Sequence, residues 1–347
     1  MEPVPIAIVG LNFGRHIAHE IVHGEAGRHV KLAAVCDMDE DKARQRADEF
    51  RVPFFTGLDQ LLADGGIPAI GLFTGPGGRA ELLDRAVEAG KDVMTTKPFE
   101  LDCGAGLSVL RKAKELGRVI HLNSPSPVET PDFKLIRRWQ KTHRLGEPVG
   151  CSASVWVRYR EAPDGRWYDD PGKCPAAPVF RIGIYLINDL VRVFGEAERL
   201  SVFSSRVFTR RPTADNAQLS ILFRSGALAS VYASFCVEDG DHHRLRMVLN
   251  FERGTVYRNA DPGRNSRPGA DLALVMGSMD AERVVVESGQ VGRMSGDYQW
   301  EEFAAAVRGE SIAETATPES IVSGLRIIEA MAEAEKGQGV AEVRRAG

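Results

Sequence analysis

The sequence predicts an α/β protein that begins with a doubly wound parallel sheet and continues into a second domain. Short apolar runs alternate with amphipathic segments as far as residue 122, which is the order of a parallel sheet with crossover helices. Later β-like runs are mostly joined by short turns, which favour antiparallel pairing. The length of 347 residues exceeds one typical domain core. We therefore expect two domains, residues 1–123 and residues 124–347.

The first element is an apolar run, Ile6–Val9, that leads directly into Gly10-Leu11-Asn12-Phe13-Gly14. A second apolar run, residues 32–35, ends on Cys36-Asp37. Strand, glycine turn, helix, strand and acidic residue is the order that binds a dinucleotide, with pyrophosphate at the helix N-terminus and the carboxylate on the adenosine ribose. The alternative is an ordinary tight turn without a ligand.

The glycine turn departs from the usual fingerprint at two positions. Asn12 stands where a glycine is usual, and Gly14 falls one place early. Asparagine tolerates positive φ, so Asn12 can replace a turn glycine, while Gly14 still allows close backbone approach. Asp37 suits the two ribose hydroxyls of NAD and would repel the 2′-phosphate of NADP, so NAD is favoured over NADP.

The next elements continue the alternation of helices and strands. The pattern indicates further segments at 41–50, 58–62, 67–73, 79–89, 92–94, 104–116 and 119–122. Ligands bind at the carboxyl ends of such strands. The strand ends carry Thr74-Gly75-Pro76, Thr96-Lys97-Pro98 and Asn123, which we expect to converge on one crevice. From composition alone, the first of these loops is equally consistent with a plain surface loop.

The second half begins with prolines and a helix at 132–142. A β-like run covers residues 149–159, and others follow at 200–207, 216–223, 227–235, 245–251, 254–257 and 283–287. Helical spacing returns at 298–308 and 318–336, and these helices close the second domain or lean back on the first. Residues 262–269 form the segment that we predict to be the most mobile loop.

Composition excludes several classes of function. A net charge of -4 leaves no field to attract nucleic acid or an anionic membrane. No apolar stretch has the length of a bilayer span, no signal peptide precedes Ile6, and the five cysteines lack CxxC spacing. We therefore expect a cytoplasmic protein with free thiols. His16, His19 and His23 share a helix face, but this helix packs beside a sheet, so we predict no metal site.

Lys97 is the strongest single candidate for catalysis. It follows a strand, is fixed by Pro98, and lies where the nicotinamide end of a cofactor bound at Gly10–Gly14 would reach. A lysine there can hold or protonate a substrate oxygen. The alternative is a solvent-exposed lysine at a strand end.

Three motifs together resemble the Gfo/Idh/MocA oxidoreductase family: the glycine turn, Thr96-Lys97-Pro98, and Arg181-Ile182-Gly183-Ile184-Tyr185-Leu186-Ile187-Asn188. The resemblance implies a Rossmann domain that binds NAD or NADP, followed by an α/β domain with a large open, mainly antiparallel sheet. The family's Glu-Lys-Pro motif matches Thr96-Lys97-Pro98, so the lysine is present and the glutamate is not. Its Asp-x-Gly-x-His-x-x-Asp motif matches residues 181–188, with Tyr185 in the histidine place, as in the glucose-fructose oxidoreductase and dihydrodiol dehydrogenase branch.

These positions suggest an acid/base pair. The ammonium of Lys97 would stabilise a phenolate at Tyr185 and help it to exchange a proton with an alcohol. The alternative is a tyrosine packed in an apolar helix face. Arg181 puts a cation where the resemblance implies a carboxylate, and three interpretations stay open. The cation binds an acidic group of the substrate, or the site has lost the usual catalysis and kept only cofactor binding, or Arg181 pairs with Asp189 or Asp170.

The sequence therefore predicts an NAD(P)-dependent dehydrogenase or reductase. Hydride would pass between nicotinamide and a hydroxyl or carbonyl carbon of a sugar, polyol or sugar acid, with Asn123, Arg181 and Asn188 orienting the substrate. One alternative is a catalytically weak NAD-binding sensor, and another is NAD-assisted elimination or hydrolysis. The wide second sheet predicts a homodimer or homotetramer.

Overall fold

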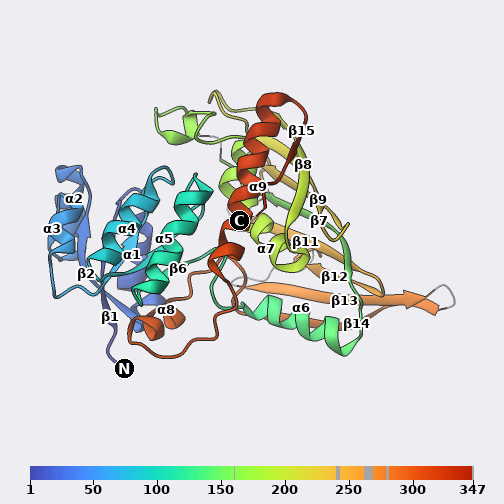
Figure 1. Ribbon diagram of the computed structural model, residues 1–347, viewed down its shortest axis with the longest axis horizontal. Coiled ribbons are helices and arrows are strands. Elements are labelled where there is room, and N and C mark those ends of the chain that lie inside the picture. Colours follow the sequence, from blue (N-terminus) through green and yellow to red (C-terminus); the bar gives the residue numbers. More distant parts are fainter. Residues whose placement is uncertain (160, 240–242, 262–268, 279–280, 346–347) are drawn as a thin grey trace. The chain divides into compact units, whose positions relative to one another are not determined.

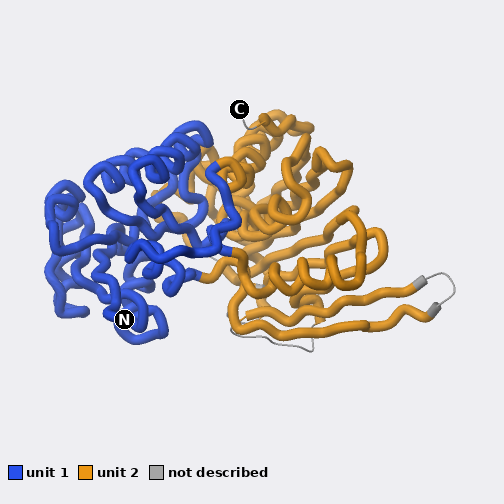
Figure 2. The backbone as a smooth tube through the Cα atoms, turned by 60° about the horizontal axis from the view of Figure 1, so that its bottom comes forward, with its two compact units in different colours: residues 1–128, 298–318 blue, residues 129–297, 319–347 orange. Residues whose placement is uncertain are grey.

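A computed structural model describes residues 1–159, 161–239, 243–261, 269–278 and 281–345. The chain forms two compact units, coloured separately in Figure 2. The first contains residues 1–128 and 298–318, and the second contains residues 129–297 and 319–347. The division into independently folding domains at residues 123 and 124 stays a prediction.

The first unit is built on a six-stranded sheet of order β3-β2-β1-β4-β5-β6. Strands β1, β2 and β6 of this sheet are labelled in Figure 1. Every strand pairing in the sheet is parallel. This is the strand order of a dinucleotide-binding fold, and it confirms the predicted doubly wound sheet. The strands are β1 Val4–Val9, β2 Val30–Cys36, β3 Phe54–Phe55, β4 Ala69–Leu72, β5 Asp92–Thr95 and β6 Ile120–Leu122.

Helices follow the strands of this sheet as the amphipathic spacing predicts. In α1, for example, Ile17, Ala18 and Ile21 are buried, whereas the polar residues between them face outward. The helices are α1 Gly14–His23, α2 Glu40–Phe50, α3 Leu58–Leu62, α4 Arg79–Glu88, α5 Cys103–Glu115 and α8 Trp300–Val307, with a 3₁₀ turn at Glu25–Arg28.

Helix α8 comes from the far end of the sequence but completes the core of the first unit. Trp300 and Phe303 belong to the same buried cluster as Ile8 and Phe73. Phe303 is fully buried and also meets the ring of His121 on β6, with the ring centroids 6.0 Å apart. Of the two late helices, α8 thus packs in the first unit.

The second unit contains a nine-stranded sheet of order β14-β13-β12-β11-β7-β10-β9-β8-β15. Strands β7 and β10 pair in parallel, and the other neighbours pair antiparallel. The predicted mainly antiparallel sheet is confirmed. Its strands are β7 Pro148–Trp156, β8 Ala197–Ser205, β9 Asn216–Phe223, β10 Leu228–Ser234, β11 Arg244–Phe251, β12 Gly254–Arg258, β13 Ala270–Ser278, β14 Ala281–Val291 and β15 Val340–Glu342.

The two faces of this sheet differ because side chains alternate along each strand. One face carries a buried row in register, Val202, Leu219, Val231, Ala153 and Met247. We call this the inner face. The outer face carries Ser201, Ser220, Ser230 and Ser152 in register.

The helices of the second unit include α7, which contacts β7 and β10, and α6, which contacts β13. They are α6 Pro131–Thr142, α7 Ile184–Phe194 and α9 Pro318–Gly337, with a 3₁₀ turn at Trp167–Asp169 and a π-helical turn at Val179–Gly183 leading into α7. Among the residues that the structure describes, no helix combines the length and the apolar character needed to cross a membrane.

The sequence analysis missed two strands of the second sheet. In β13, the buried Ala270, Leu272 and Leu274 alternate with less buried residues, so the two-residue period was available as a signal. Strand β15 has only three residues, which is too short to show a period. The predicted mobile loop at 262–269 lies, apart from Gly269, outside the described residues.

Candidate functional site

The glycine turn after β1 is shaped by a close approach to the loop after β4. Gly10 has φ +85°, and a Cβ on it would lie 3.0 Å from the carbonyl carbon and oxygen of Phe73 and from the amide nitrogen of Thr74. A side chain there would therefore meet both backbone strain and backbone atoms. A glycine at this position therefore allows the turn after β1 and the loop after β4 to approach closely at the carboxyl edge of the sheet.

Asn12 does not use positive φ, so the expected reason for its place in the turn is wrong. In this turn, only Gly10 adopts a left-handed conformation, and Asn12 is exposed. Gly14 serves helix packing: a Cβ on it would lie 2.7 Å from Cγ2 of Ile8. Phe13 remains 45% exposed at the start of the helix and forms a T-shaped ring contact with Phe73.

The N-terminus of α1 differs from those of α2 and α5. Asp39 and Asp102 accept hydrogen bonds from first-turn amides and so cap α2 and α5. Helix α1 has no side-chain cap and no acidic residue in its first turn. The first turn of α1 therefore keeps backbone amides that no side chain of its own caps, which fits the pyrophosphate of a dinucleotide.

Asp37 lies directly after β2, beside the glycine turn. Its Oδ2 accepts a hydrogen bond from the Leu11 amide at 2.8 Å, and its Oδ1 accepts one from the Asp39 amide at 3.1 Å. The Lys42 ammonium lies 3.6 Å from Oδ1. A carboxylate held in this way keeps further lone pairs for ribose hydroxyls, so its chemistry fits the adenosine end of the cofactor.

The loop after β4 contains the predicted residues Thr74, Gly75 and Pro76. Thr74 and Gly75 are partly exposed and Pro76 is buried. The Thr74 hydroxyl donates to the Gly75 carbonyl at 3.3 Å. The Thr74 carbonyl accepts a hydrogen bond from the buried guanidinium of Arg79, a residue that the sequence analysis did not single out.

Lys97 lies beside Asn123, as predicted for two neighbouring strand ends. The Asn123 Oδ1 accepts a hydrogen bond from the Lys97 amide at 3.2 Å and from the Thr96 hydroxyl at 3.3 Å. Asn123 is 1% exposed, whereas Thr96 and Lys97 are partly exposed. The structure thus brings Thr96, Lys97 and Asn123 together, with the amide of Asn123 bracing the lysine backbone.

In the second unit, Arg181 pairs with an acid other than those expected. Its Nη1 lies 2.8 Å from Oε2 of Glu161, and its Nη2 donates to Oε1 at 3.3 Å. Of the two acids named in one of the three alternatives for Arg181, Asp189 bonds to Arg258 and Asp170 lies 3.7 Å from Lys173. Nothing in the sequence pattern linked residue 181 to residue 161.

Aromatic rings surround the Arg181 guanidinium. Its carbon lies 4.8–5.1 Å from the ring centroids of Tyr159, Tyr168 and Phe235. Burial acts to lower the pKa of Arg181, but Glu161 outweighs burial and holds the pKa above its ordinary value. A second cation, Arg211, lies 3.5 Å from the same Glu161 carboxylate. The charge of Arg181 is thus already balanced within the unit.

Tyr185 and Asn188 both lie against glycines. Tyr185 is partly exposed, and a Cβ on Gly296 would lie 3.0 Å from Cδ1 of its ring. A Cβ on Gly324 would lie 1.9 Å from Oδ1 of Asn188, which is 6% exposed. Each side chain therefore occupies space that only a glycine neighbour leaves open.

A buried ionic cluster fixes the helix that carries Tyr185. Arg258 on β12 is 1% exposed, and it donates to Asp132 at 2.8 Å and to Asp189 at 2.6 Å. The Ser295 hydroxyl also donates to Asp189, and this holds the loop that contains Gly296. Burial raises the pKa of Asp189, with Arg258 opposing the rise. The sequence analysis missed this cluster because its members are far apart in the chain.

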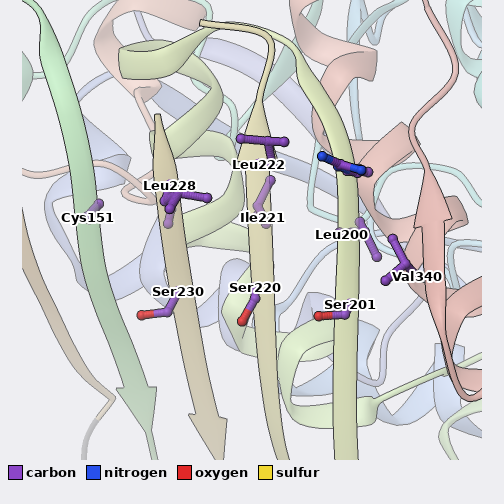
Figure 3. Close-up of a pocket in the computed structure, with 11 residues that line it drawn as sticks. Cys151, Leu200, Ser201, Ser220, Ile221, Leu222, Leu228, Ser230 and Val340 are labelled. Carbon is purple, nitrogen blue, oxygen red and sulfur yellow. The ribbon is translucent and has the colours of Figure 1, made fainter. Parts of the chain in front are cut away.

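The histidine face of α1 and a hollow on the second sheet are two further features, and neither contains a residue that we predict to act in the site. On α1, the rings of His19 and His23 are 4.6 Å apart, and no group of three metal-ligating side chains occurs in the described ranges. A hollow on the second sheet is lined in part by Ser201, Ser220 and Ser230, which stand side by side on β8, β9 and β10 (Figure 3).

The strand order, the uncapped helix after β1 and the residues at the strand ends together define the first unit as a nucleotide-binding unit of the oxidoreductase type. Residues 4–124 match the family model described as an oxidoreductase family with an NAD-binding Rossmann fold. Residues 133–257 match the model of the GFO/IDH/MocA C-terminal domain. The chain belongs to the Gfo/Idh/MocA family.

Curated relatives and solved structures agree with this assignment. An uncharacterized oxidoreductase of Schizosaccharomyces pombe is 28% identical over 201 residues, which cover 56% of this chain and 53% of the relative. A dTDP-3,4-didehydro-2,6-dideoxy-α-D-glucose 3-reductase of Streptomyces violaceoruber is 27% identical over 46% of each chain. The chain thus spans about half the length of these relatives.

Among solved structures, levoglucosan dehydrogenase in complex with NADH and L-sorbose superposes with a TM-score of 0.78. The superposition covers 100% of both chains at 15% identity. At this identity, the likeness shows a common fold. The predicted combination of a Rossmann sheet with a mainly antiparallel sheet is confirmed.

Proposed function

We propose that this protein is an NAD(P)-dependent oxidoreductase that transfers hydride between nicotinamide and a hydroxyl or carbonyl carbon of a small polyhydroxylated molecule. The observation that carries the proposal is a set of three features that follow strands of the first unit. They are the uncapped start of α1 after β1, the hydrogen-bonded carboxylate of Asp37 after β2, and Lys97 after β5, whose amide is held by Asn123. These groups match the pyrophosphate, the ribose and the reacting end of a dinucleotide.

A sugar, polyol or sugar acid is the substrate class that we propose. The support comes from two similar proteins that concern sugars, namely a dTDP-sugar 3-reductase and a levoglucosan dehydrogenase in complex with L-sorbose. Asn123 and Asn188 offer amide groups that can both donate and accept hydrogen bonds, which suits hydroxyl-rich ligands.

The chemistry of the step needs a proton to move with the hydride. The bound cofactor supplies the hydride acceptor or donor. We assign Lys97 and Tyr185 the exchange of the substrate hydroxyl proton, through Nζ or Oη. This assignment stays a prediction: Lys97 belongs to the first unit and Tyr185 to the second.

Arg181 takes a modified role in the proposal. Glu161 already balances the charge of Arg181. We infer that the Glu161 carboxylate accepts hydrogen bonds from substrate hydroxyl groups, and that Arg181 acts on the substrate by holding this carboxylate in place. NAD is the favoured cofactor because Asp37 would repel a 2′-phosphate, although Lys42 lies close by.

The test is to follow NADH absorbance while the purified protein is challenged with NAD⁺ and a panel of sugars, polyols and sugar acids. We expect turnover on at least one compound and a loss of about a hundredfold or more in Lys97→Met and Tyr185→Phe. Lys134→Met and Tyr232→Phe, which make the same two substitutions away from the proposed site residues, are the controls. NADH binding without turnover on any compound would favour a sensor, and product formation without net NADH would favour elimination or hydrolysis.

We also propose that copies of the chain associate through the outer face of the second sheet. Leu228 and Phe203 are 63% and 80% exposed there, so association through this face would remove two large apolar side chains from water. Light scattering tests this directly, because a species of 38 kDa, the mass of one chain, would reject a dimer or tetramer.

A further inference from the structure

Arg79 is a buried cation whose guanidinium donates hydrogen bonds to three backbone carbonyls. It is the first residue of α4 and is 2% exposed. Its Nη1 donates at 2.7 Å to the carbonyls of both Thr96 and Pro98, and its Nη2 donates to the carbonyl of Thr74. One guanidinium thus joins the loop after β4 to the loop after β5.

The two carbonyls bound by Nη1 flank Lys97 in the chain. The amide of Lys97 itself is held by Asn123 at 3.2 Å. Hydrogen bonds therefore fix the backbone before, at and after the lysine, which limits the positions that its side chain can reach. A planar, forked donor is needed to reach three carbonyls at once, and arginine provides one.

Glu100 adds a further link between the start of α4 and the loop after β5. Its Oε2 accepts a hydrogen bond from the Ala80 amide and its Oε1 accepts one from the Leu101 amide, both at 2.6 Å. Glu100 is 3% exposed. Burial lowers the pKa of Arg79 to about 10, with Tyr298 and Glu100 opposing the shift, so the guanidinium remains charged at neutral pH.

We propose that Arg79 is a positioning residue for the candidate site, which sets the placement of Lys97 and couples it to the cofactor-facing loop Thr74–Pro76. The inference rests on the proposed function in two respects, namely that Lys97 acts on the substrate and that the loop Thr74–Pro76 faces the cofactor. The three hydrogen bonds from Arg79 to the two loops lie entirely within the first unit.

If Arg79 only stabilised the fold, replacing it should have the same effects as replacing another buried cation of the first unit. Lys91 supplies the comparison. It is 5% exposed, its Nζ donates to the carbonyls of Asp64 at 2.5 Å and Ile67 at 2.8 Å, and it precedes β5 at the amino end of the strand. Lys91 and Arg79 thus hold opposite ends of the same strand.

The experiment compares Arg79→Met, Arg79→Lys and Lys91→Met in the full chain. Hydrogen exchange is followed by mass spectrometry in peptides covering residues 72–79 and 95–101, together with Tm and NADH affinity from fluorescence. We expect both Arg79 variants to speed exchange in both loops, by about tenfold or more in Arg79→Met, and to weaken NADH binding by a similar factor. Lys91→Met should lower Tm without either effect.

The proposal is overturned if exchange in both loops is unchanged in the Arg79 variants, or if Lys91→Met alters the loops and NADH affinity equally. Should Arg79→Met fail to fold, the same comparison is made with Arg79→Lys, which keeps the charge but not the fork. A wild-type protein that neither binds NADH nor turns over any substrate would count against the proposed function, whereas the exchange rates would still decide the role of Arg79.

Discussion

The Asp37 carboxylate accepts a hydrogen bond from the backbone amide of Leu11 across 2.8 Å. This bond ties the end of β2 to the glycine turn after β1, so two separate parts of the proposed cofactor site share one anchor. Asp37 is 13% exposed and has Lys42 at 3.6 Å, which places a carboxylate and an ammonium side by side where the ribose is expected.

Replacing Asp37 should change cofactor preference. In Asp37→Ser, we expect NADH binding to weaken by about tenfold, and NADPH binding to improve relative to it, because the repulsion of a 2′-phosphate disappears while Lys42 remains. Fluorescence titration with both cofactors measures the ratio. Asp39→Ser, which keeps a capping hydroxyl on α2, is the control and should leave the ratio unchanged. An unaltered ratio in Asp37→Ser would remove Asp37 from the site.

Adding one methyl group at Gly296 should disturb Tyr185. Gly296 has φ +102°, and its Cβ would lie 3.0 Å and 3.1 Å from Cδ1 and Cε1 of the tyrosine ring. We expect Gly296→Ala to lower the free energy of unfolding by about 1–3 kcal/mol in urea titrations. Gly292→Ala is the control, because nothing lies within 4 Å of the added methyl. Equal effects of the two substitutions would contradict the packing described for Tyr185.

Removing the cation from the buried cluster should be costly. Arg258→Met leaves Asp132 and Asp189 buried without their partner, and we expect a loss of about 3–5 kcal/mol at neutral pH. The loss should shrink in acid, because a protonated Asp189 needs no cation. Chemical denaturation at several pH values measures it. The exposed Arg246→Met is the control, and a loss no larger than that of this control would refute the assigned role.

The buried His121 should make stability depend on pH. Burial lowers the pKa of its imidazole to about 4 from 6.5. Between these values the unfolded chain binds a proton that the folded chain does not, so the free energy of unfolding falls as pH decreases through this window, by about 3 kcal/mol in total.

Comparison of the wild-type protein with His121→Leu isolates this contribution, since other groups titrate alike in both. The difference in unfolding free energy should be constant above pH 6.5 and should change steadily toward pH 4 in favour of the variant. A difference that is flat across this range would show that the imidazole is accessible to protons in the folded state.

Local patterns predicted most of the first unit but only part of the second. Ile6–Val9 and the turn that follows carry a strand, a positive φ at Gly10 and a helix start within a few residues, so neighbouring positions suffice. The loops with Lys97 and Asn123 could be expected to meet because parallel strands end at one edge. These are consequences of sheet geometry rather than of particular contacts.

The contacts that fix the candidate side chains were outside the reach of such patterns. Arg181 bonds to Glu161, and Arg258 joins residues that lie 69 and 126 positions away in the chain. Buried charges choose partners by three-dimensional proximity, which periodicity does not encode. Arg79 was closer to prediction, since it begins a helix directly after two glycines, but its carbonyl partners depend on the two loops being neighbours.

Helix α8 gives the chain an unusual connectivity, because residues 298–318 return to the first unit and residues 319–347 leave it again. A fragment that stops at residue 128 would lack Trp300 and Phe303 and would expose the apolar surface they cover. We therefore expect a fragment of residues 1–128 to be less stable than the first unit within the full chain. The apolar core of the first unit is therefore complete only after residues 298–318 have been synthesised.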